Sequence, residues 1–330
     1  MQRYRSIGTR LLATGMVLMS ALFANASCAQ ETFPAKPLTL VVPFAPGGGT
    51  DILARIIATG MSAQLGQPVV VENKPGAFTT IAVSSILHAK PDGYTMLLGN
   101  TNTFVVNELL QKNLSYDARK DLSAIGSVAR FPMILVVPES SPVKSVSQFI
   151  EYAKSKANPI QYASPGIGSP HHLSMEMLKD QAKIAATHVA YRGVSPAFPD
   201  LLAGRLDAMF VDYAAGAGLI KDGRLRPLAV ASKEPSPLVP GISPLADQGY
   251  PEFDITGWQA IAVSAGTPQP AIDKLAQALR ATMESADIRQ KLIDAGLEPF
   301  HLGPKAFDSY VETERQRLGH LVKTNHITID

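Results

Sequence analysis

One segment, residues 38–66, places a strand pattern, a glycine turn and a helix start in direct succession. Residues 38–42 (LTLVV) form an apolar, β-branched run with the length and composition of a buried strand. Three consecutive glycines follow. Thr50 and Asp51, both residue types that cap helix starts, precede apolar residues at helical spacing, and Gly66 is placed to end that helix. The segment therefore predicts a strand, a loop and a helix of an α/β fold.

The glycine loop also predicts an anion site. The first N–H groups of a helix lack acceptors inside the helix, and the helix dipole leaves roughly half a positive charge there. Gly47, Gly48 and Gly49 carry no side chain that would keep a ligand away from those amides. A carboxylate or phosphate can then bind without lysine or arginine. The alternative is a tight turn with a purely structural role.

Residues 1–29 have the features of a signal peptide. Three arginines precede a short apolar stretch at residues 11–24, and Ser27-Cys28-Ala29 offers a cleavage site before Gln30. A second cut is possible after Ala26. The apolar stretch is too short to span a bilayer comfortably, so we expect a chain exported to the periplasm.

Charge and cysteine content exclude several functions. Removing the three leader arginines from the formal charge of +2 leaves −1, which offers no electrostatic footprint for nucleic acid or a membrane surface. Cys28 is the only cysteine, and lipid anchoring there is not expected because Asn25-Ala26-Ser27 lacks the usual aliphatic residue. The mature chain is then thiol-free, without cysteine nucleophiles or thiolate metal sites.

The mature chain alternates apolar runs with helical segments, which predicts mostly parallel sheets flanked by helices. The loop at residues 164–169 (SPGIGS) repeats the opening pattern, with a strand before it, Ser169 as N-cap and Pro170 at the first helical position. Two glycine loops at the carboxyl ends of strands predict two α/β domains with a cleft between them. We place the first domain at residues 30–130 plus 254–330, and the second at residues 131–253.

Motifs for catalysis are absent from the sequence. Residues 46–50 do not match the dinucleotide-binding glycine pattern, and no phosphate-binding P-loop motif occurs. Ser169 does not lie in a nucleophile elbow. His171 and His172 are adjacent, so on a helix they diverge by ~100° and cannot form a metal-binding pair. We therefore expect no enzyme, no cofactor and no metal site.

Several single residues allow two interpretations. Asp51 can cap its helix or contact a ligand, and Asp212, which follows an apolar strand, can belong to the site or cap a turn. Arg192 can face solvent or the rim of the cleft. Trp258, the single tryptophan, fits core packing better than the cleft wall.

The sequence resembles the Bug-type substrate-binding proteins of tripartite tricarboxylate transporters. The resemblance rests on the residues 42–51 (VPFAPGGGTD) and continues through most of the mature chain. The other matching segments, in order, are 72–77 (ENKPGA), 91–95 (PDGYT), Tyr116-Asp117, 162–173 (YASPGIGSPHHL), 188–193 (HVAYRG), 201–204 (LLAG), Gly257-Trp258 and 265–268 (AGTP).

The resemblance implies a two-domain periplasmic-binding-protein fold of the Venus flytrap type that closes on a small carboxylate. In such proteins main-chain amides and ordered water of two glycine loops hold the carboxylate. Carried over, the first loop gives Phe44, Ala45, Gly47, Gly48, Gly49, Thr50 and Asp51. The opposing loop gives Ser164, Gly166, Gly168, Ser169 and His171, and Asp212 lies where the family commonly has an aspartate near the cleft.

One departure concerns the loop after Ala77. The family usually continues with two glycines, whereas this chain has Phe78 and Thr79. Both residues are therefore candidates for the site. A phenyl ring there can stack on an aromatic carboxylate or exclude a bulky one, so citrate should not be assumed as ligand.

The expected function is an extracytoplasmic solute receptor that delivers a small carboxylate to a tripartite tricarboxylate-type membrane permease. We expect a monomer that has the permease subunits as partners and binds no nucleic acid. Two alternatives remain, a sensory binding subunit for a membrane kinase and a hydrolase that uses the same cleft. The second is disfavoured because no nucleophile, base and orienting residue occur together in the motifs.

Overall fold

The computed structural model describes residues 33–329. The predicted signal peptide at residues 1–29, its cleavage sites and Cys28 lie outside this range. From Lys36 onward the described chain forms one compact unit, to which the fold and the pocket below belong. None of the helices described there has the length and apolar character needed to cross a membrane.

Three parallel strands begin the first sheet. The strand β1 (Leu38–Val42) pairs with β2 (Val69–Asn73) on one side and with β3 (Thr95–Asn100) on the other. The side chains of Leu38, Leu40 and Val41 are fully buried, as the apolar run predicts. The carboxyl ends of these strands consequently lie at one edge of the sheet.

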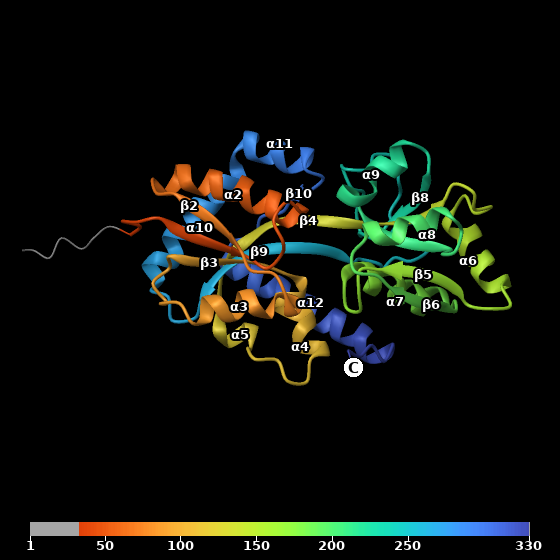
Figure 1. Cartoon of the computed structure of the whole chain (residues 1–330), viewed down its shortest axis with the longest axis horizontal. Coiled ribbons are helices and arrows are strands. Elements are labelled where there is room, and N and C mark those ends of the chain that lie inside the picture. Colours follow the sequence, from red (N-terminus) through yellow and green to blue (C-terminus); the bar gives the residue numbers. More distant parts are fainter. Residues whose placement is uncertain (1–32, 330) are drawn as a thin grey trace, which may run out of the picture. The chain divides into compact units, whose positions relative to one another are not determined.

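Two long strands continue this sheet and connect it to the second one. The strand β9 (Thr256–Ser264) pairs antiparallel with β3, and β4 (Leu122–Pro138) pairs antiparallel with β9. Up to Pro132 the partner of β4 is β9, and from Met133 its partner is a strand of the second sheet. In Figure 1 both strands run side by side through the middle of the ribbon. The short β10 (Glu298–Pro299) also pairs with β4.

The second sheet contains a parallel group and an antiparallel group. The strand β5 (Ile160–Ser164) pairs in parallel with β6 (Ala186–Ala190) and β7 (Ala208–Asp212). Both β7 and β8 (Leu225–Val230) pair antiparallel with β4. The sheets are therefore mixed and not mostly parallel as expected, because buried apolar runs do not record strand direction.

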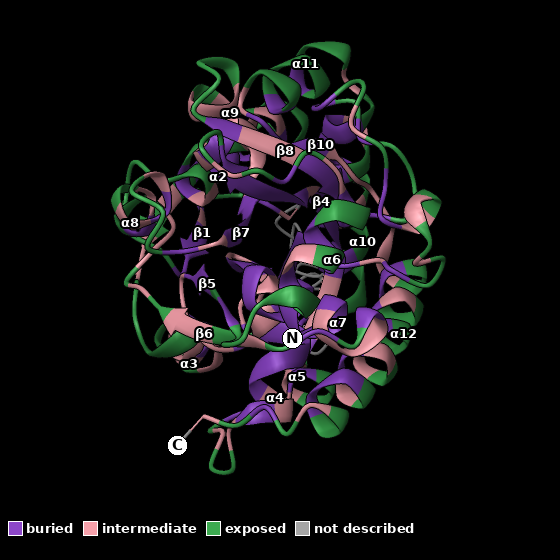
Figure 2. Cartoon of the chain, turned by 90° about the vertical axis from the view of Figure 1, so that its right-hand side faces the viewer, coloured by how far each residue is buried: buried purple, intermediate pink, exposed green. Residues whose placement is uncertain are grey.

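Helices cover both sheets. Their bounds are α2 (Gly49–Leu65), α3 (Thr80–Leu87), α4 (Asn107–Leu110), α5 (Ala118–Asp121), α6 (Val146–Ser155), α7 (Pro170–Ala182), α8 (Phe198–Leu202), α9 (Tyr213–Lys221), α10 (Gln269–Glu284), α11 (Ala286–Asp294) and α12 (Pro304–Thr324). Short turns of other helix types are η1 (Ala77–Thr79), η2 (Asn102–Val106), η3 (Ser195–Ala197) and η4 (Ala246–Gln248). Figure 2 shows buried strands inside and exposed outer faces on the helices.

The indole of Trp258 lies in the core, where its ring is fully buried. It packs edge-on against Phe307 and Tyr310, with ring centroids 5.3 and 5.7 Å away. Its N–H donates to the Oε2 atom of Glu314 on α12 at 3.2 Å. This bond links β9 to α12, and burial raises the pKa of Glu314 although Arg317 opposes that effect.

Removal of the indole donor should destabilise the fold. We expect Trp258→Phe to lower the free energy of unfolding by about 1–3 kcal/mol, because the buried Glu314 carboxyl loses a donor. Urea unfolding followed by far-UV circular dichroism measures this change. The variant Glu314→Gln retains an acceptor and should lose less. Equal stability of Trp258→Phe and the natural chain would contradict this role of the bond.

Candidate functional site

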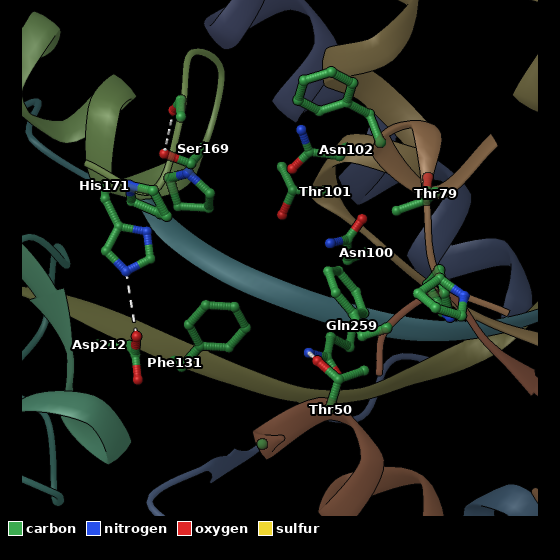
Figure 3. A pocket seen from close by; sticks show the side chains of 18 of the residues that line it. Thr50, Thr79, Asn100, Thr101, Asn102, Phe131, Ser169, His171, Asp212 and Gln259 are labelled. Atoms are coloured by element: carbon green, nitrogen blue, oxygen red, sulfur yellow. Dashed lines mark hydrogen bonds and ion pairs between the residues drawn. The ribbon is translucent and has the colours of Figure 1, made fainter. Parts of the chain in front are cut away.

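A pocket of about 510 Å³ opens at the carboxyl ends of β1, β3, β5 and β7. Its lining comes from the loop after β1 and the start of α2, from the loop before α3, from the end of β3, and from the loop before α7. Figure 3 shows side chains from these elements facing one another across the pocket. The volume is in the usual range for small-molecule sites.

The start of α2, which has no side-chain cap, lies at this pocket. Gly48 is the N-cap residue in an extended conformation (φ −84°, ψ 170°) and has no side chain with which to cap the helix. The first helical hydrogen bond runs from the Ile52 N–H to the Gly48 carbonyl, so the N–H groups of Gly49 and Thr50 precede it. Gly49 and Thr50 both line the pocket. The helix start is therefore suited to bind an anion.

Asp51 is not the N-cap that its sequence position suggests, because α2 begins at Gly49. Its carboxylate instead turns back toward the loop that precedes the helix. The Oδ2 atom accepts from the Gly47 N–H at 3.0 Å and from Arg55 at 2.9 Å, and Oδ1 accepts from Asn73 at 3.0 Å. Asp51 is buried and does not line the pocket, and the Gly47 N–H is already engaged. Its role in this structure is to hold the loop.

The turn before α3 has an unusual backbone. Ala77, Phe78 and Thr79 have φ values of +45°, +50° and +79°, a left-handed region that non-glycine residues rarely adopt. The side chain of Asn107 donates to the Phe78 carbonyl at 2.6 Å, which fixes this turn. Phe78 and Thr79 both line the pocket, and Phe78 is 52% exposed.

Two further phenylalanines, Phe44 and Phe131, line the pocket with Phe78. A Cβ atom at Gly257 would lie 2.1 Å from the Phe131 ring, so the missing side chain of Gly257 lets the ring rest on β9. Part of the apolar lining is therefore aromatic, and it comes from β4 as well as from the loops.

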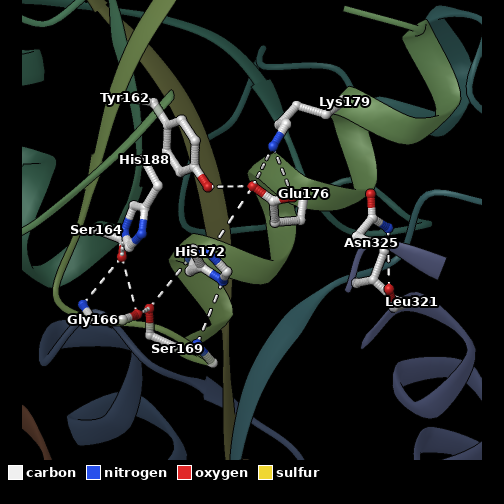
Figure 4. A network of polar contacts seen from close by, with 11 residues as sticks. Tyr162, Ser164, Gly166, Ser169, His172, Glu176, Lys179, His188, Leu321 and Asn325 are labelled. Atoms are coloured by element: carbon white, nitrogen blue, oxygen red, sulfur yellow. Dashed lines mark hydrogen bonds and ion pairs between the residues drawn. The ribbon is translucent and has the colours of Figure 1, made fainter. Parts of the chain in front are cut away.

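The loop before α7 differs from the one before α2 because its helix is capped. The Ser169 hydroxyl accepts from the His172 N–H at 3.2 Å, and Pro170 occupies the first helical position, as predicted. The Ser164 hydroxyl accepts the Gly166 N–H at 3.1 Å and bonds to His188 at 2.7 Å (Figure 4). Ser164 is fully buried beneath the loop.

The network under this loop extends along α7. The Tyr162 hydroxyl and the Lys179 ammonium both donate to the Glu176 carboxylate (Figure 4). The His172 and His188 rings lie with centroids 4.4 Å apart, and burial lowers the pKa of both, that of His172 to about 3. Both rings are therefore neutral near pH 7, where they pack against each other and His188 also bonds to Ser164.

His171 and Asp212 form a pair at the pocket wall. The Nε2 atom of His171 lies 3.2 Å from the Oδ2 atom of Asp212, as Figure 3 shows. Asp212 also caps α9 by accepting the Ala215 N–H at 2.9 Å. Burial alone would raise the pKa of Asp212, but His171 and the helix N–H outweigh it, so the pKa stays below its usual value. Asp212 therefore lies at the pocket and also caps a helix, so neither of the two interpretations from the sequence excludes the other.

Most of the expected site residues lie at this pocket. Those that line it are Phe44, Ala45, Gly49, Thr50, Phe78, Thr79, Gly166, Ser169, His171 and Asp212. Those that do not are Gly47, Gly48, Asp51, Ser164 and Gly168. A Cβ at Gly168 would lie 2.5 Å from Leu110, so this glycine permits the loop to approach α4. Arg192 is not among the lining residues.

A group of polar residues at the centre of the pocket was not predicted from the sequence. Asn100 is the last residue of β3, Thr101 and Asn102 follow it, and Gln259 lies in the middle of β9. The Gln259 amide donates to the Thr50 hydroxyl at 3.0 Å, while its buried Oε1 atom has no partner among the described residues. Polar residues directly after a buried strand, and one inside an apolar strand, are the signals that could have identified them.

The charged content of the lining is small. His171 and Asp212 are its only ionisable residues, and within the described chain neither lysine nor arginine contributes to it. Residues 33–329 also contain no group of three or more His, Cys, Asp or Glu side chains arranged to hold a metal ion. An anion in this pocket would meet main-chain dipoles, amides, hydroxyls, one imidazole and the Asp212 carboxylate that is paired with it.

Acid should weaken the loop that Asp51 holds. The Arg55 hydrogen bond, followed by that of Gly47, lowers the pKa of Asp51 from 3.8 to about 2. A depressed pKa stabilises the folded state above the unfolded value and loses this effect as the pH falls toward 2. The free energy of unfolding should therefore fall more steeply between pH 4 and 2.5 in the natural chain than in Asp51→Asn. Urea titrations at several pH values test this, and parallel curves would contradict it.

The left-handed backbone of the turn before α3 leads to a second prediction, which concerns Phe78. A glycine at residue 78 should relieve left-handed strain, so we expect Phe78→Gly to leave the free energy of unfolding unchanged or raise it by about 1 kcal/mol. The matched control is Ile52→Gly, a similarly exposed apolar residue inside α2, which should lose about 1 kcal/mol. Thermal and urea unfolding compare the two. Equal losses would show that the turn at Phe78 carries no strain.

Comparisons with known proteins fit this geometry. Residues 53–327 match the model of the tripartite tricarboxylate transporter family receptor, TctC. BugT from Bordetella pertussis is 30% identical over 316 residues, which are 96% of this chain and 97% of BugT. Among solved structures, Rpa4515 of R. palustris with adipate is 32% identical with a TM-score of 0.80, and 90% of this chain covers all of that one. MatC from Rhodopseudomonas palustris with bound malate is 31% identical with a TM-score of 0.75, covering 88% of this chain and 100% of that one.

The resemblance stated from the sequence is thus confirmed, as are the α/β class and the two-domain periplasmic-binding-protein character of the fold. The match covers most of the chain, and the relatives are matched over nearly their full length. The chain belongs to the tripartite tricarboxylate transporter receptor family and is a Bug-type solute-binding protein.

Proposed function

We propose that this protein captures a small carboxylate outside the cytoplasm and delivers it to a tripartite tricarboxylate-type membrane permease. The observation that carries the proposal is the uncapped start of α2, where Gly49 and Thr50 line the pocket and their N–H groups precede the first helical hydrogen bond. Relatives solved with adipate and with malate support a carboxylate as ligand. The family supports transport as the purpose of binding.

The carboxylate would bind at the start of α2, where the helix dipole favours negative charge. The Thr50 hydroxyl and the side-chain amides of Asn100 and Asn102 offer further donors around that position. On the opposite side of the pocket, Ser169 and His171 would contact another part of the ligand. Gly47, Gly48, Asp51, Ser164 and Gly168 would act indirectly, by shaping the two loops.

Binding would close two domains on the ligand. We propose residues 30–130 plus 254–330 as one domain and residues 131–253 as the other. The change of strand partner along β4, between Pro132 and Met133, supports a connection near the first of these limits. A ligand that contacts both sides favours the closed form by its extra contacts, without any covalent chemistry.

The cellular setting follows from the same family membership. We propose that the leader at residues 1–29 directs export to the periplasm, where a monomer collects its ligand and presents it to the permease subunits. No enzymatic step is part of this proposal. Turnover of a carboxylic ester or amide by the purified protein would instead favour a hydrolase.

A panel of carboxylates tests the proposal directly. We expect adipate, malate or benzoate to raise the melting temperature of the purified protein by several degrees, because a ligand at about 100 times its Kd stabilises the folded state by about 2.7 kcal/mol. Thermal-shift assays and calorimetry measure this. Failure of mono-, di- and aromatic carboxylates alike to bind would overturn the proposal.

Two neighbouring glycines supply a matched pair of variants. Gly49 lines the pocket and Gly48 does not, and a Cβ atom at either residue meets nothing closer than 3.8 Å. Aspartate is well tolerated at a helix start, so both variants should fold. We expect Gly49→Asp to reduce carboxylate affinity at least about tenfold, from charge repulsion at short range, and Gly48→Asp to reduce it less. Equal affinity of Gly49→Asp and the natural chain would remove the α2 start from the site.

A further inference from the structure

The ring of His171 is held by one nitrogen only. Its Nε2 atom lies 3.2 Å from the Asp212 carboxylate, and Asp212 is itself fixed because it caps α9 through the Ala215 N–H. The ring sits on the first turn of α7, directly after Pro170. In Figure 3 the ring and the carboxylate stand together at one wall of the pocket. The contact with Asp212 therefore fixes the position of the imidazole ring.

The other ring nitrogen of His171 makes no hydrogen bond within the described residues. The Nδ1 atom of His171 is buried and has no hydrogen-bond partner in the described part of the chain, and the residue as a whole is only 7% exposed. Buried polar atoms without partners are rare in native proteins because each loses its bonds to water. His171 lines the pocket, and a ligand atom that reached Nδ1 would supply the missing partner.

The Asp212 carboxylate decides which proton the neutral ring carries. A carboxylate accepts hydrogen bonds, so the neutral imidazole must carry its proton on Nε2 and present a bare lone pair at Nδ1. A bare lone pair repels the oxygens of a carboxylate. The protonated ring instead carries N–H groups at both nitrogens and can donate to Asp212 and to a ligand carboxylate together.

Charged groups on the elements around His171 are engaged elsewhere. Glu176 on α7 pairs with Lys179 at 2.8 Å, and Arg130 on β4 pairs with Glu298 of β10 at 2.8 Å. The neighbouring His172 packs against His188 and lies 4.0 Å from Glu176. Among the residues that line the pocket, Asp212 is the only ionisable partner of His171. A bound carboxylate would be the second anion beside this ring.

We propose that His171 takes up a proton when a carboxylate binds, so that Nδ1–H donates to the ligand while Nε2–H stays on Asp212. This inference rests on the proposed carboxylate-binding function and deepens it. His171 becomes the cationic contact of a pocket whose lining has no lysine or arginine among the described residues. The proton comes from solvent, and no covalent bond forms or breaks in the ligand. The pair would thus discriminate carboxylates from neutral compounds of the same shape.

Proton uptake has a direct calorimetric signature. Whichever of malate, adipate or benzoate binds the purified protein most tightly is titrated in HEPES and in Tris, whose ionisation enthalpies differ. We expect uptake of up to about one proton per ligand at pH 8, and an affinity that falls as the pH rises, by at most about tenfold per pH unit. The direction follows because, on this proposal, the complex holds one more proton than the free protein and ligand together.

Three variants separate this role from a structural one. His171→Gln should bind more weakly, show no proton uptake and lose the pH dependence. Asp212→Asn still caps α9 but removes the anion behind the ring, so uptake at pH 8 should fall and affinity with it. His88→Gln removes an exposed histidine outside the pocket and should change neither quantity.

The outcomes distinguish this inference from the proposed function. Carboxylate binding without proton uptake, or pH dependence that persists in His171→Gln, would overturn the inference and leave the receptor function standing. Absence of binding by every carboxylate probe would overturn both. Circular dichroism of each variant verifies the fold, and Asp212→Asn supplies the decisive result if His171→Gln does not fold.

Discussion

The buried carboxylate of Asp51 holds the loop between β1 and α2 in the form on which the pocket depends. It binds the Gly47 N–H, Arg55 and Asn73, and the Asn73 amide also binds the Phe44 carbonyl at 3.0 Å. An anion so close to a proposed anion site would repel the ligand if it were unpaired, but the Arg55 guanidinium contacts both of its oxygens. The loop is therefore fixed before a ligand arrives, and preorganised donors bind with less loss of entropy.

The two sides of the pocket offer different chemistry, although their sequences look alike. At α2 the helix start is uncapped, so main-chain N–H groups are free to meet a ligand. At α7 the Ser169 side chain occupies the helix start and Ser164 occupies the Gly166 N–H, so the side chain of His171 becomes the open contact. On the proposed function, the first side holds any small anion, and the second side recognises what distinguishes one ligand from another.

Local patterns predicted much of this fold, and long-range contacts account for the rest. The helix predicted after the loop at residues 164–169 begins at Pro170 with Ser169 as its N-cap, and Gly66 ends α2 as predicted, since these end signals are encoded locally. The antiparallel course of β4 and β9 is not encoded in their apolar composition. That arrangement brings Gln259 to Thr50 across the first sheet, so the polar centre of the pocket could not be predicted from adjacent residues.

Three phenylalanines in the lining, Phe44, Phe78 and Phe131, narrow the kind of ligand that suits the pocket. Three consecutive residues in the left-handed region store strain at its edge, and Asn107 and Thr103 hold them there by bonds to Phe78 and Thr79. The result is an exposed Phe78 ring that lines the same pocket as Phe44 and Phe131. Apolar rings contribute to the free energy of binding only when the ligand removes them from water. A ligand with polar groups alone would therefore gain nothing from these three rings. A carboxylate that carries a hydrocarbon or aromatic portion would use both the donors at the start of α2 and the rings beside them.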